Sequence, residues 1–86
     1  MNTYQPLSCD MHDYLEIACM YGYHLQVERI DGCSYAARAL TTRTAASKEE
    51  FLVLCGNSDR FEVRLDRLLA ITPLDANARF GRIELR

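Results

Sequence analysis

Residues 22–40, GYHLQVERIDGCSYAARAL, alternate between apolar and polar side chains on both sides of a central Asp-Gly pair. An alternation of period two is typical of a half-buried β-strand. The Asp31-Gly32 pair favours a type I′ hairpin turn, in which both central residues adopt positive φ. We therefore predict a β-hairpin, with Cys33 to Leu40 as its returning strand. Its apolar face is predicted to carry Tyr23, Leu25, Val27, Tyr35, Ala37 and Ala39.

The segment that precedes the hairpin is predicted to be a helix, from about Asp10 to Tyr21. Its apolar residues return at helical spacing, and Ser8 and Asp10 are both favourable N-cap residues. At about 100° per residue the acidic side chains fall opposite most apolar ones, so we expect the apolar face to pack on the core. That face consists of Met11, Tyr14, Leu15, Ala18 and Cys19, whereas Asp10, Asp13 and Glu16 lie opposite, together with Ile17 and Met20.

Further strands follow the hairpin at short intervals. Residues 41–47 are rich in Thr, Ala and Ser without a strong period and are predicted to be a loop. Predicted strands cover residues 51–55, 60–68 and, after a bend, 69–72, with a shorter strand at 80–85. In the second of these, Phe61, Val63 and Leu65 are expected to point inward, and Glu62, Arg64 and Asp66 outward in opposite-charge cross-strand pairs.

The order of these elements predicts one domain over residues 1–86 that is mainly β, with one N-terminal helix. A chain of this length suffices for one compact domain. One helix followed by several short strands is typical of a strongly bent antiparallel sheet or small β-barrel. The helix, at about 10–21, is expected to cover one open end of a barrel formed by about residues 22–86.

Composition and charge argue against several classes of protein. No run approaches the roughly 20 apolar residues of a membrane span, and no basic patch leads into an apolar run near the N-terminus, so we expect a cytoplasmic protein. The net charge of −2 argues against direct binding of nucleic acid. The four cysteines form no C-x-x-C pair. We therefore expect reduced thiols and neither a metal nor a cofactor.

Two other functions fit parts of the sequence. A nucleophilic set of Cys33, His24 and Asp31 is conceivable across the hairpin. No Gly-rich phosphate loop, metal-ligand spacing or nucleophile elbow accompanies it, and we expect no enzymatic activity. A small RNA-binding barrel is the second alternative, although acidic residues interrupt its basic stripe. The stripe consists of Arg38, Arg60, Arg64 and Arg67, and the interrupting acids are Asp59, Glu62 and Asp66.

The acidic character of the chain is concentrated at the N-terminus. Residues 1–21 contain three acidic residues and neither Lys nor Arg. The ordinary interpretation is a solvated helix face, but Ile17 and Met20 fall among the acids. An apolar pair framed by carboxylates is typical of a contact surface for a basic partner. Arg43 and Lys48, in or beside the predicted loop, form a second candidate contact region.

The N-terminal segment resembles a known family. Tyr4-Gln5-Pro6-Leu7-Ser8-Cys9-Asp10, followed by His12-Asp13, Leu15-Glu16 and Ala18-Cys19, is similar to the N-terminal signature of the Rof/YaeO family. Later matches occur in order: a Val-bearing strand into Asp31-Gly32, an Ala-bearing strand, Lys48-Glu49-Glu50-Phe51-Leu52-Val53 and Arg64-Leu65-Asp66. Together they cover most of residues 4–71, and the sequence departs from the family pattern after Thr72.

The resemblance implies an Sm-like fold, in which an N-terminal helix caps a small, strongly bent antiparallel β-barrel. It also implies binding to the N-terminal, RNA-capturing domain of the termination factor Rho, which would block the primary RNA site and reduce Rho-dependent termination. An Sm-like RNA-binding module is the alternative. We expect the free protein to be a monomer. The expected Rho contacts are Asp10, His12, Asp13, Tyr14 and Glu16, with Ile17 and Met20 among them and Lys48 and Arg43 as a second region.

Overall fold

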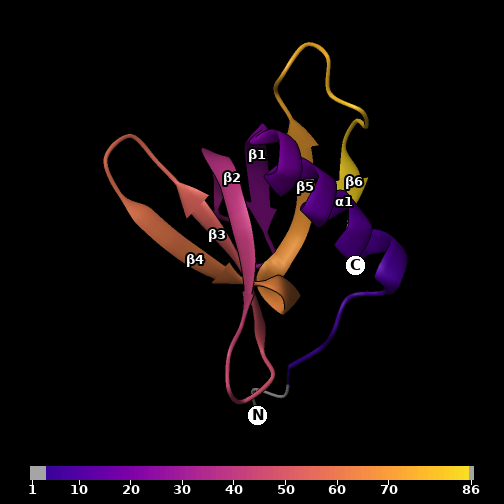
Figure 1. Cartoon of the computed structure of the whole chain (residues 1–86), viewed down its shortest axis with the longest axis vertical. Helices are drawn as coiled ribbons and strands as arrows, with labels where there is room; N and C mark the ends of the chain where they lie inside the picture. Colours follow the sequence, from indigo (N-terminus) through magenta and orange to yellow (C-terminus); the bar gives the residue numbers. More distant parts are fainter. Residues whose placement is uncertain (1–3, 86) are drawn as a thin grey trace.

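The structure is a computed structural model that describes residues 4–85 of the chain (Figure 1). One α-helix, α1 (Cys9–Tyr21), precedes the strands. No helix in this described part has the length and apolar character needed to cross a bilayer. The strands are β1 (His24–Arg29), β2 (Ser34–Thr44), β3 (Glu50–Cys55), β4 (Arg60–Arg64), β5 (Leu68–Pro73) and β6 (Ile83–Glu84), with a 3-10 turn, η1 (Leu65–Arg67), between β4 and β5.

All six strands belong to one antiparallel sheet, in the order β4-β3-β2-β1-β5-β6. Figure 1 shows that the sheet bends strongly, so that the β3–β4 hairpin is turned away from β5 and β6. Within residues 4–85, β4 and β6 form the two edges and do not pair with each other. The predicted fold class is therefore confirmed as a bent antiparallel sheet with one helix, although the sheet stays open.

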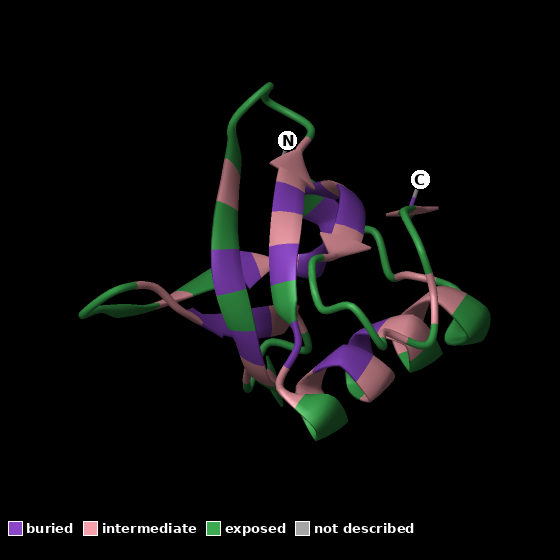
Figure 2. Ribbon diagram, turned by 90° about the horizontal axis from the view of Figure 1, so that it is seen from above, coloured by how far each residue is buried: buried purple, intermediate pink, exposed green. Residues whose placement is uncertain are grey.

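One face of the sheet and one face of α1 form the core. Leu15 and Ala18 of the helix are both 0% exposed, and α1 packs chiefly against β2. Figure 2 shows the buried and exposed residues alternating along the strands, as the period of two predicted. The buried sheet residues include Leu25, Val27, Ala37, Ala39, Leu52, Leu54, Val63 and Ile71.

Both ends of α1 are capped. The Ser8 Oγ accepts a hydrogen bond from the Met11 N–H at 3.3 Å, so Ser8, and not Asp10, is the N-cap residue. Gly22 follows the helix with φ of 62°, a left-handed conformation that glycine adopts without steric cost. The last turn contains no basic residue, but the Arg38 guanidinium of β2 lies beside Gly22. A positive charge there stabilises the negative end of the helix dipole.

The β1–β2 turn differs from the predicted type I′ geometry. Gly32 has φ of 92°, whereas the φ of Asp31 is not positive. The Gly32 N–H donates to the Arg29 carbonyl at 3.1 Å, and the Arg29 N–H donates to the Cys33 carbonyl at 2.8 Å. The Asp31 carboxylate accepts the Cys33 N–H at 3.0 Å. This side-chain hydrogen bond stabilises a longer turn that needs positive φ only at the glycine.

The predicted loop at 41–47 is wrong in part, because β2 continues to Thr44. After a register shift between Ala39 and Thr41, the strand pairs with β3 as far as Thr44 opposite Glu50. This part of the β2–β3 ribbon, residues 41–50, extends beyond the core, so most of its side chains are exposed and lack an apolar alternation (Figure 2). Threonine nevertheless favours the extended backbone. We call this projecting ribbon the β2–β3 arm.

The prediction that Asp66 points outward is wrong, because η1 interrupts the strand after Arg64. Asp66 is only 8% exposed. Its carboxylate accepts hydrogen bonds from the Arg64 guanidinium at 2.7 and 2.9 Å and from the Gln5 N–H at 3.2 Å. Asp66 thereby ties the N-terminal segment to the sheet. Glu62 does point outward and forms the predicted kind of pair, with Arg43 of β2 at 2.8 Å.

Replacing Asp66 with Ala is expected to lower the free energy of unfolding by roughly 2 kcal/mol, because it removes a buried carboxylate that accepts three part-buried hydrogen bonds from Arg64 and Gln5. Urea unfolding followed by circular dichroism measures the change. Asp59→Ala is the matched control, since Asp59 is exposed in the β3–β4 turn. Equal losses in the two variants would contradict a structural role for Asp66.

Candidate functional site

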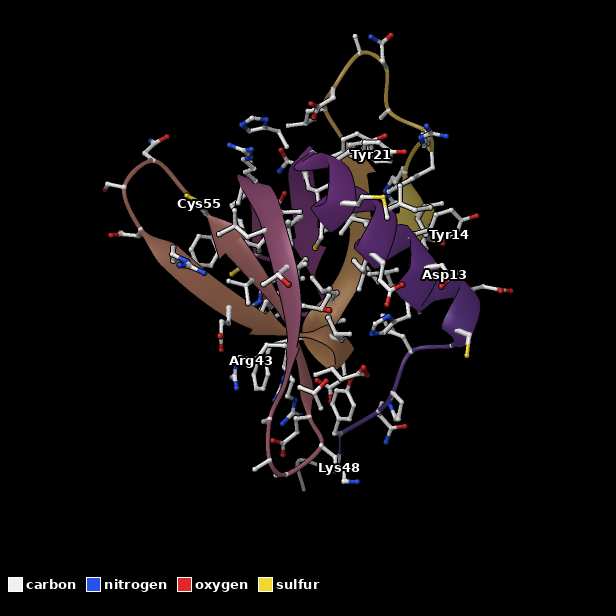
Figure 3. All side chains as sticks on the ribbon, viewed as in Figure 1. Asp13, Tyr14, Tyr21, Arg43, Lys48 and Cys55 are labelled. Atoms are coloured by element: carbon white, nitrogen blue, oxygen red, sulfur yellow. The ribbon has the colours of Figure 1, made fainter. Side chains whose placement is uncertain are left out.

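The solvent-facing side of α1 carries three carboxylates, which we call the acidic face: Asp10, Asp13 and Glu16. Asp10 and Asp13 are exposed, and the Glu16 side chain is 59% exposed. Successive members are three residues apart, so they rise about 4.5 Å along the axis and stay on one side of the helix. Figure 3 shows Asp13 on the surface of α1. Asp10 and Asp13 form no ion pair with any residue in the range 4–85.

His12 connects the acidic face to the sheet. Its Nδ1 lies 3.3 Å from a Glu16 carboxylate oxygen, and its Nε2 lies 3.0 Å from one of Glu50 in β3. Glu50 also accepts a hydrogen bond from the Tyr4 hydroxyl at 3.3 Å. Burial and the Glu50 charge raise the pKa of Tyr4 to about 12, so the hydroxyl keeps its proton and remains a donor. Sequence reasoning missed Glu50, because no local pattern relates it to His12.

Tyr14 is fixed by the C-terminal segment. Its ring packs edge-on against Phe80 with a centroid distance of 5.1 Å, and Phe80 in turn packs against Tyr23 at 6.0 Å. The Tyr23 hydroxyl accepts the Arg79 N–H at 3.0 Å. Tyr14 is therefore half-buried at the border of the acidic face (Figure 3). Phe80 was predicted only as part of a strand, and its contact with the helix has no signal in the sequence.

Ile17 and Met20, which were both predicted to lie among the acids, behave differently. Ile17 is half-buried and packs against the core cluster, so its placement away from the core was wrong. The apolar stripe of α1 is therefore wider than the five predicted residues. Met20 is 74% exposed and does lie on the surface.

The C-terminal end of α1 has a basic neighbour that its own sequence lacks. The Arg79 guanidinium lies 4.8 Å from the centroid of the Tyr21 ring, and Tyr21 is 49% exposed. Tyr21 also stacks on Tyr23 at 5.7 Å. The negative charge of α1 is therefore strongest in its first turns and is offset near its last turn.

The structure separates Arg43 and Lys48 from the acidic face (Figure 3). The Arg43 guanidinium donates to both Glu62 oxygens at 2.8 Å and lies 4.7 Å from the Phe51 ring centroid. Lys48 is exposed in the turn of the β2–β3 arm, with φ of 79°. Arg43 is thus engaged within the sheet, whereas Lys48 is presented to solvent.

The structure does not assemble the conceivable nucleophilic set. His24 pairs with Arg38 at one end of the β1–β2 hairpin, whereas Cys33 lies in the turn at the other end. The Asp31 carboxylate is already bonded to the Cys33 N–H. Within residues 4–85, no group of three or more His, Cys, Asp and Glu side chains is arranged to hold a metal ion.

The acidic face is therefore a surface suited to binding. Its carboxylates are exposed and preorganised on a capped helix, and two of them are free of ion pairs in the described part of the chain. A basic partner would meet negative charge beside the exposed Met20 and the fixed Tyr14 ring. Such a combination gives electrostatic steering together with apolar contact area.

Comparison with known proteins identifies similar chains. The family model described as "Modulator of Rho-dependent transcription termination (ROF)" matches residues 6–85. Protein rof of Escherichia coli (strain K12) is 34% identical over 71 residues, which are 83% of each chain, and protein rof of Shigella flexneri matches equally. The solved structure "YaeO bound to Magnesium from Vibrio cholerae O395" superposes with a TM-score of 0.79 at 24% identity, over 86% of this chain and 96% of that one. This last similarity supports the fold.

Phe80→Leu is expected to release the Tyr14 ring, because the edge-on aromatic contact is lost while the side chain stays apolar. Changed chemical shifts of the Tyr14 ring and of the amides of residues 13–17 in NMR spectra would report the change. Phe61→Leu is the matched control, since Phe61 is half-buried and packs edge-on against Tyr35 at 5.5 Å, outside α1. An unchanged Tyr14 ring in Phe80→Leu would contradict its positioning by the C-terminal segment.

Cys19 is expected to alkylate far more slowly than Cys9 at pH 8. Burial and then the Glu16 charge raise the pKa of the Cys19 thiol to about 11, which leaves roughly 0.1% as the reactive thiolate at that pH. Cys9 is exposed. Rates of iodoacetamide addition, followed by mass spectrometry in variants that retain one cysteine each, test this. The Cys19 rate should rise about tenfold per pH unit between pH 8 and 10, and a rate equal to that of Cys9 at pH 8 would refute the burial of its thiol.

Proposed function

Because this chain belongs to the Rof family of modulators of Rho-dependent transcription termination, we propose that it binds Rho directly. The proposed contact is the N-terminal domain with which Rho captures RNA. Occupation of that domain would prevent RNA from reaching the primary site and so reduce termination. The protein would act by binding alone, without a chemical step.

The charge of α1 is the observation that supports this proposal. A site that holds RNA must offer basic and hydrogen-bonding groups to phosphates and bases. The acidic face offers carboxylates to those same groups, and Asp10 and Asp13 form no ion pair within residues 4–85 that would have to be broken first. Binding to Rho therefore gains charge pairing at little cost within this chain.

The direct contacts are divided between charged and apolar side chains. Asp10, Asp13 and Glu16 would pair with basic groups of Rho. Met20, which is 74% exposed, and the free edge of Tyr14 would supply apolar area beside them. His12 and Ile17 are held by contacts within the chain, so we assign them chiefly to orienting the helix surface.

The β2–β3 arm is the second proposed contact region. Lys48 is exposed in its turn, whereas Arg43 is held by Glu62 and Phe51. Lys48 is therefore the stronger candidate of the two. A contact through Lys48 would place its ammonium group opposite a carboxylate or a carbonyl oxygen of Rho. This contact would add specificity to the charge pairing of the helix.

Reversing two charges of the acidic face should abolish binding to Rho and leave the fold intact. Asp13→Lys combined with Glu16→Lys replaces attraction with repulsion, and each site is exposed, so packing is unaffected. Titration of labelled protein with Rho at several salt concentrations measures the effect. For the parent protein, Kd is expected to rise with ionic strength.

Asp59→Lys is the matched control for Asp13→Lys, because it makes the same change in net charge at an exposed residue outside α1. It should bind Rho like the parent, whereas Asp13→Lys alone should weaken binding about tenfold. If the double variant bound Rho as tightly as the parent, the acidic face would not be the contact. A pull-down that retained RNA instead of Rho would favour the RNA-binding alternative.

A further inference from the structure

A row of mostly basic side chains crosses four strands of the sheet, at the end of β1–β2 away from the Asp31-Gly32 turn. His24 of β1 is opposite Arg38 of β2, Arg38 is opposite Cys55 of β3, and Cys55 is opposite Arg60 of β4. Directly opposed residues in antiparallel strands project to the same face, with Cβ atoms about 5 Å apart. We call these residues the cross-strand row.

The arginines of this row differ from four other arginines that lie in or beside the sheet. Arg29, Arg43, Arg64 and Arg82 each form an ion pair with a carboxylate. Within residues 4–85, the side chains of Arg38 and Arg60 form neither a hydrogen bond nor an ion pair. Arg38 therefore gives this end of the sheet a positive charge without a carboxylate partner, even though the net charge of the chain is −2. Arg60 lies two strands away, on the far side of Cys55, and helps to lower the pKa of Glu62.

A pocket opens along this row. It has a volume of about 620 Å³ and extends from β1 and β2 to the β3–β4 turn. Figure 3 shows Cys55, one of the lining residues, well away from Asp13 of the acidic face. Its lining includes His24, Arg38, Cys55, Asn57, Leu74 and Asp75.

We infer that this pocket binds a phosphate group carried by a small organic molecule of nucleotide size. The planar Arg38 guanidinium offers paired N–H donors that match two phosphate oxygens. The Asn57 amide in the β3–β4 turn and the His24 ring of β1 add donors, and Leu74, 53% exposed, supplies an apolar wall for the organic part. The volume exceeds that of a bare phosphate and lies within the range of small-molecule sites.

Two features of the pocket restrict how the ligand binds. One edge of the Arg38 guanidinium faces Gly22 at the end of α1, where a Cβ built on Gly22 would lie 3.1 Å from Nη2. The N–H donors of Arg38 that do not face Gly22 must therefore make the contact with the phosphate. Asp75 is the one acid in the lining, and its Oδ1 accepts the His24 backbone N–H at 2.8 Å, which satisfies part of its charge. The phosphate is therefore expected at the Arg38 and Asn57 side of the pocket.

Two-dimensional NMR of the isotope-labelled whole chain tests the inference at low salt, with adenosine 5′-monophosphate, adenosine and inorganic phosphate as separate probes. The monophosphate should produce saturable shifts at residues 24, 38 and 55–57. Inorganic phosphate should shift the same residues more weakly, and adenosine should not shift them. Absence of shifts with the monophosphate, or equal shifts with adenosine, would overturn the inference.

Variants then separate a built site from general charge attraction. Arg38→Gln and Asn57→Ala should each weaken binding of the monophosphate, the first by about tenfold or more. Arg38→Lys keeps the positive charge beside Gly22 but should also weaken binding of the monophosphate, because a lysine lacks the paired N–H donors of the guanidinium. Arg43→Gln removes an arginine of the same strand outside the pocket and should bind like the parent. Equal weakening by Arg43→Gln and Arg38→Gln would refute the pocket as the site.

Discussion

The attachment of α1 to the sheet is the contact on which the rest of the molecule depends. Leu15 and Ala18 are both 0% exposed, and they can be buried only if one side of the helix faces β2. In that orientation the carboxylates of the acidic face, which are spaced three residues apart, lie on the opposite side of the helix. The hydrophobic contact that closes the core thus also determines which charges a partner can reach, because burial of ionised carboxylates against the sheet would be far more costly.

Contacts from distant parts of the chain then hold the helix surface in place. Glu50 of β3 accepts from His12 on one side, and Phe80 contacts Tyr14 on the other. The C-terminal segment is anchored in turn by the pairing of β6 with β5 and by the Arg82 ion pair with Glu28. A surface fixed in this way loses little conformational freedom when a partner binds, which favours affinity.

The sequence allowed the elements of the fold to be predicted, because their signals are local. The alternation around Leu25 and Val27, the helical spacing of α1 and the Asp-Gly turn each act over a few residues. Apart from the type of the Asp31-Gly32 turn, which a local hydrogen bond to Asp31 changes, the errors occurred where contacts between distant parts of the chain determine the structure. β2 runs to Thr44 because β3 pairs with it, and Asp66 is buried because η1 turns it toward Arg64 and Gln5. The exposure of Asp10 and Asp13 followed from periodicity, whereas the contacts of Ile17, Glu50 and Phe80 required the assembled sheet.

The open edges of the sheet have a consequence for self-association. An exposed strand edge offers unpaired backbone groups to a second copy, and long apolar edges promote aggregation. β4 carries Arg60, Glu62 and Arg64 along its short length, and β6 is limited to Ile83–Glu84. In natural sheets, charged side chains and short edge strands hinder the pairing of an edge with a strand from another copy. The charges of β4 and the short length of β6 therefore disfavour edge-to-edge pairing of two copies, although the sheet lacks the closure of a complete barrel.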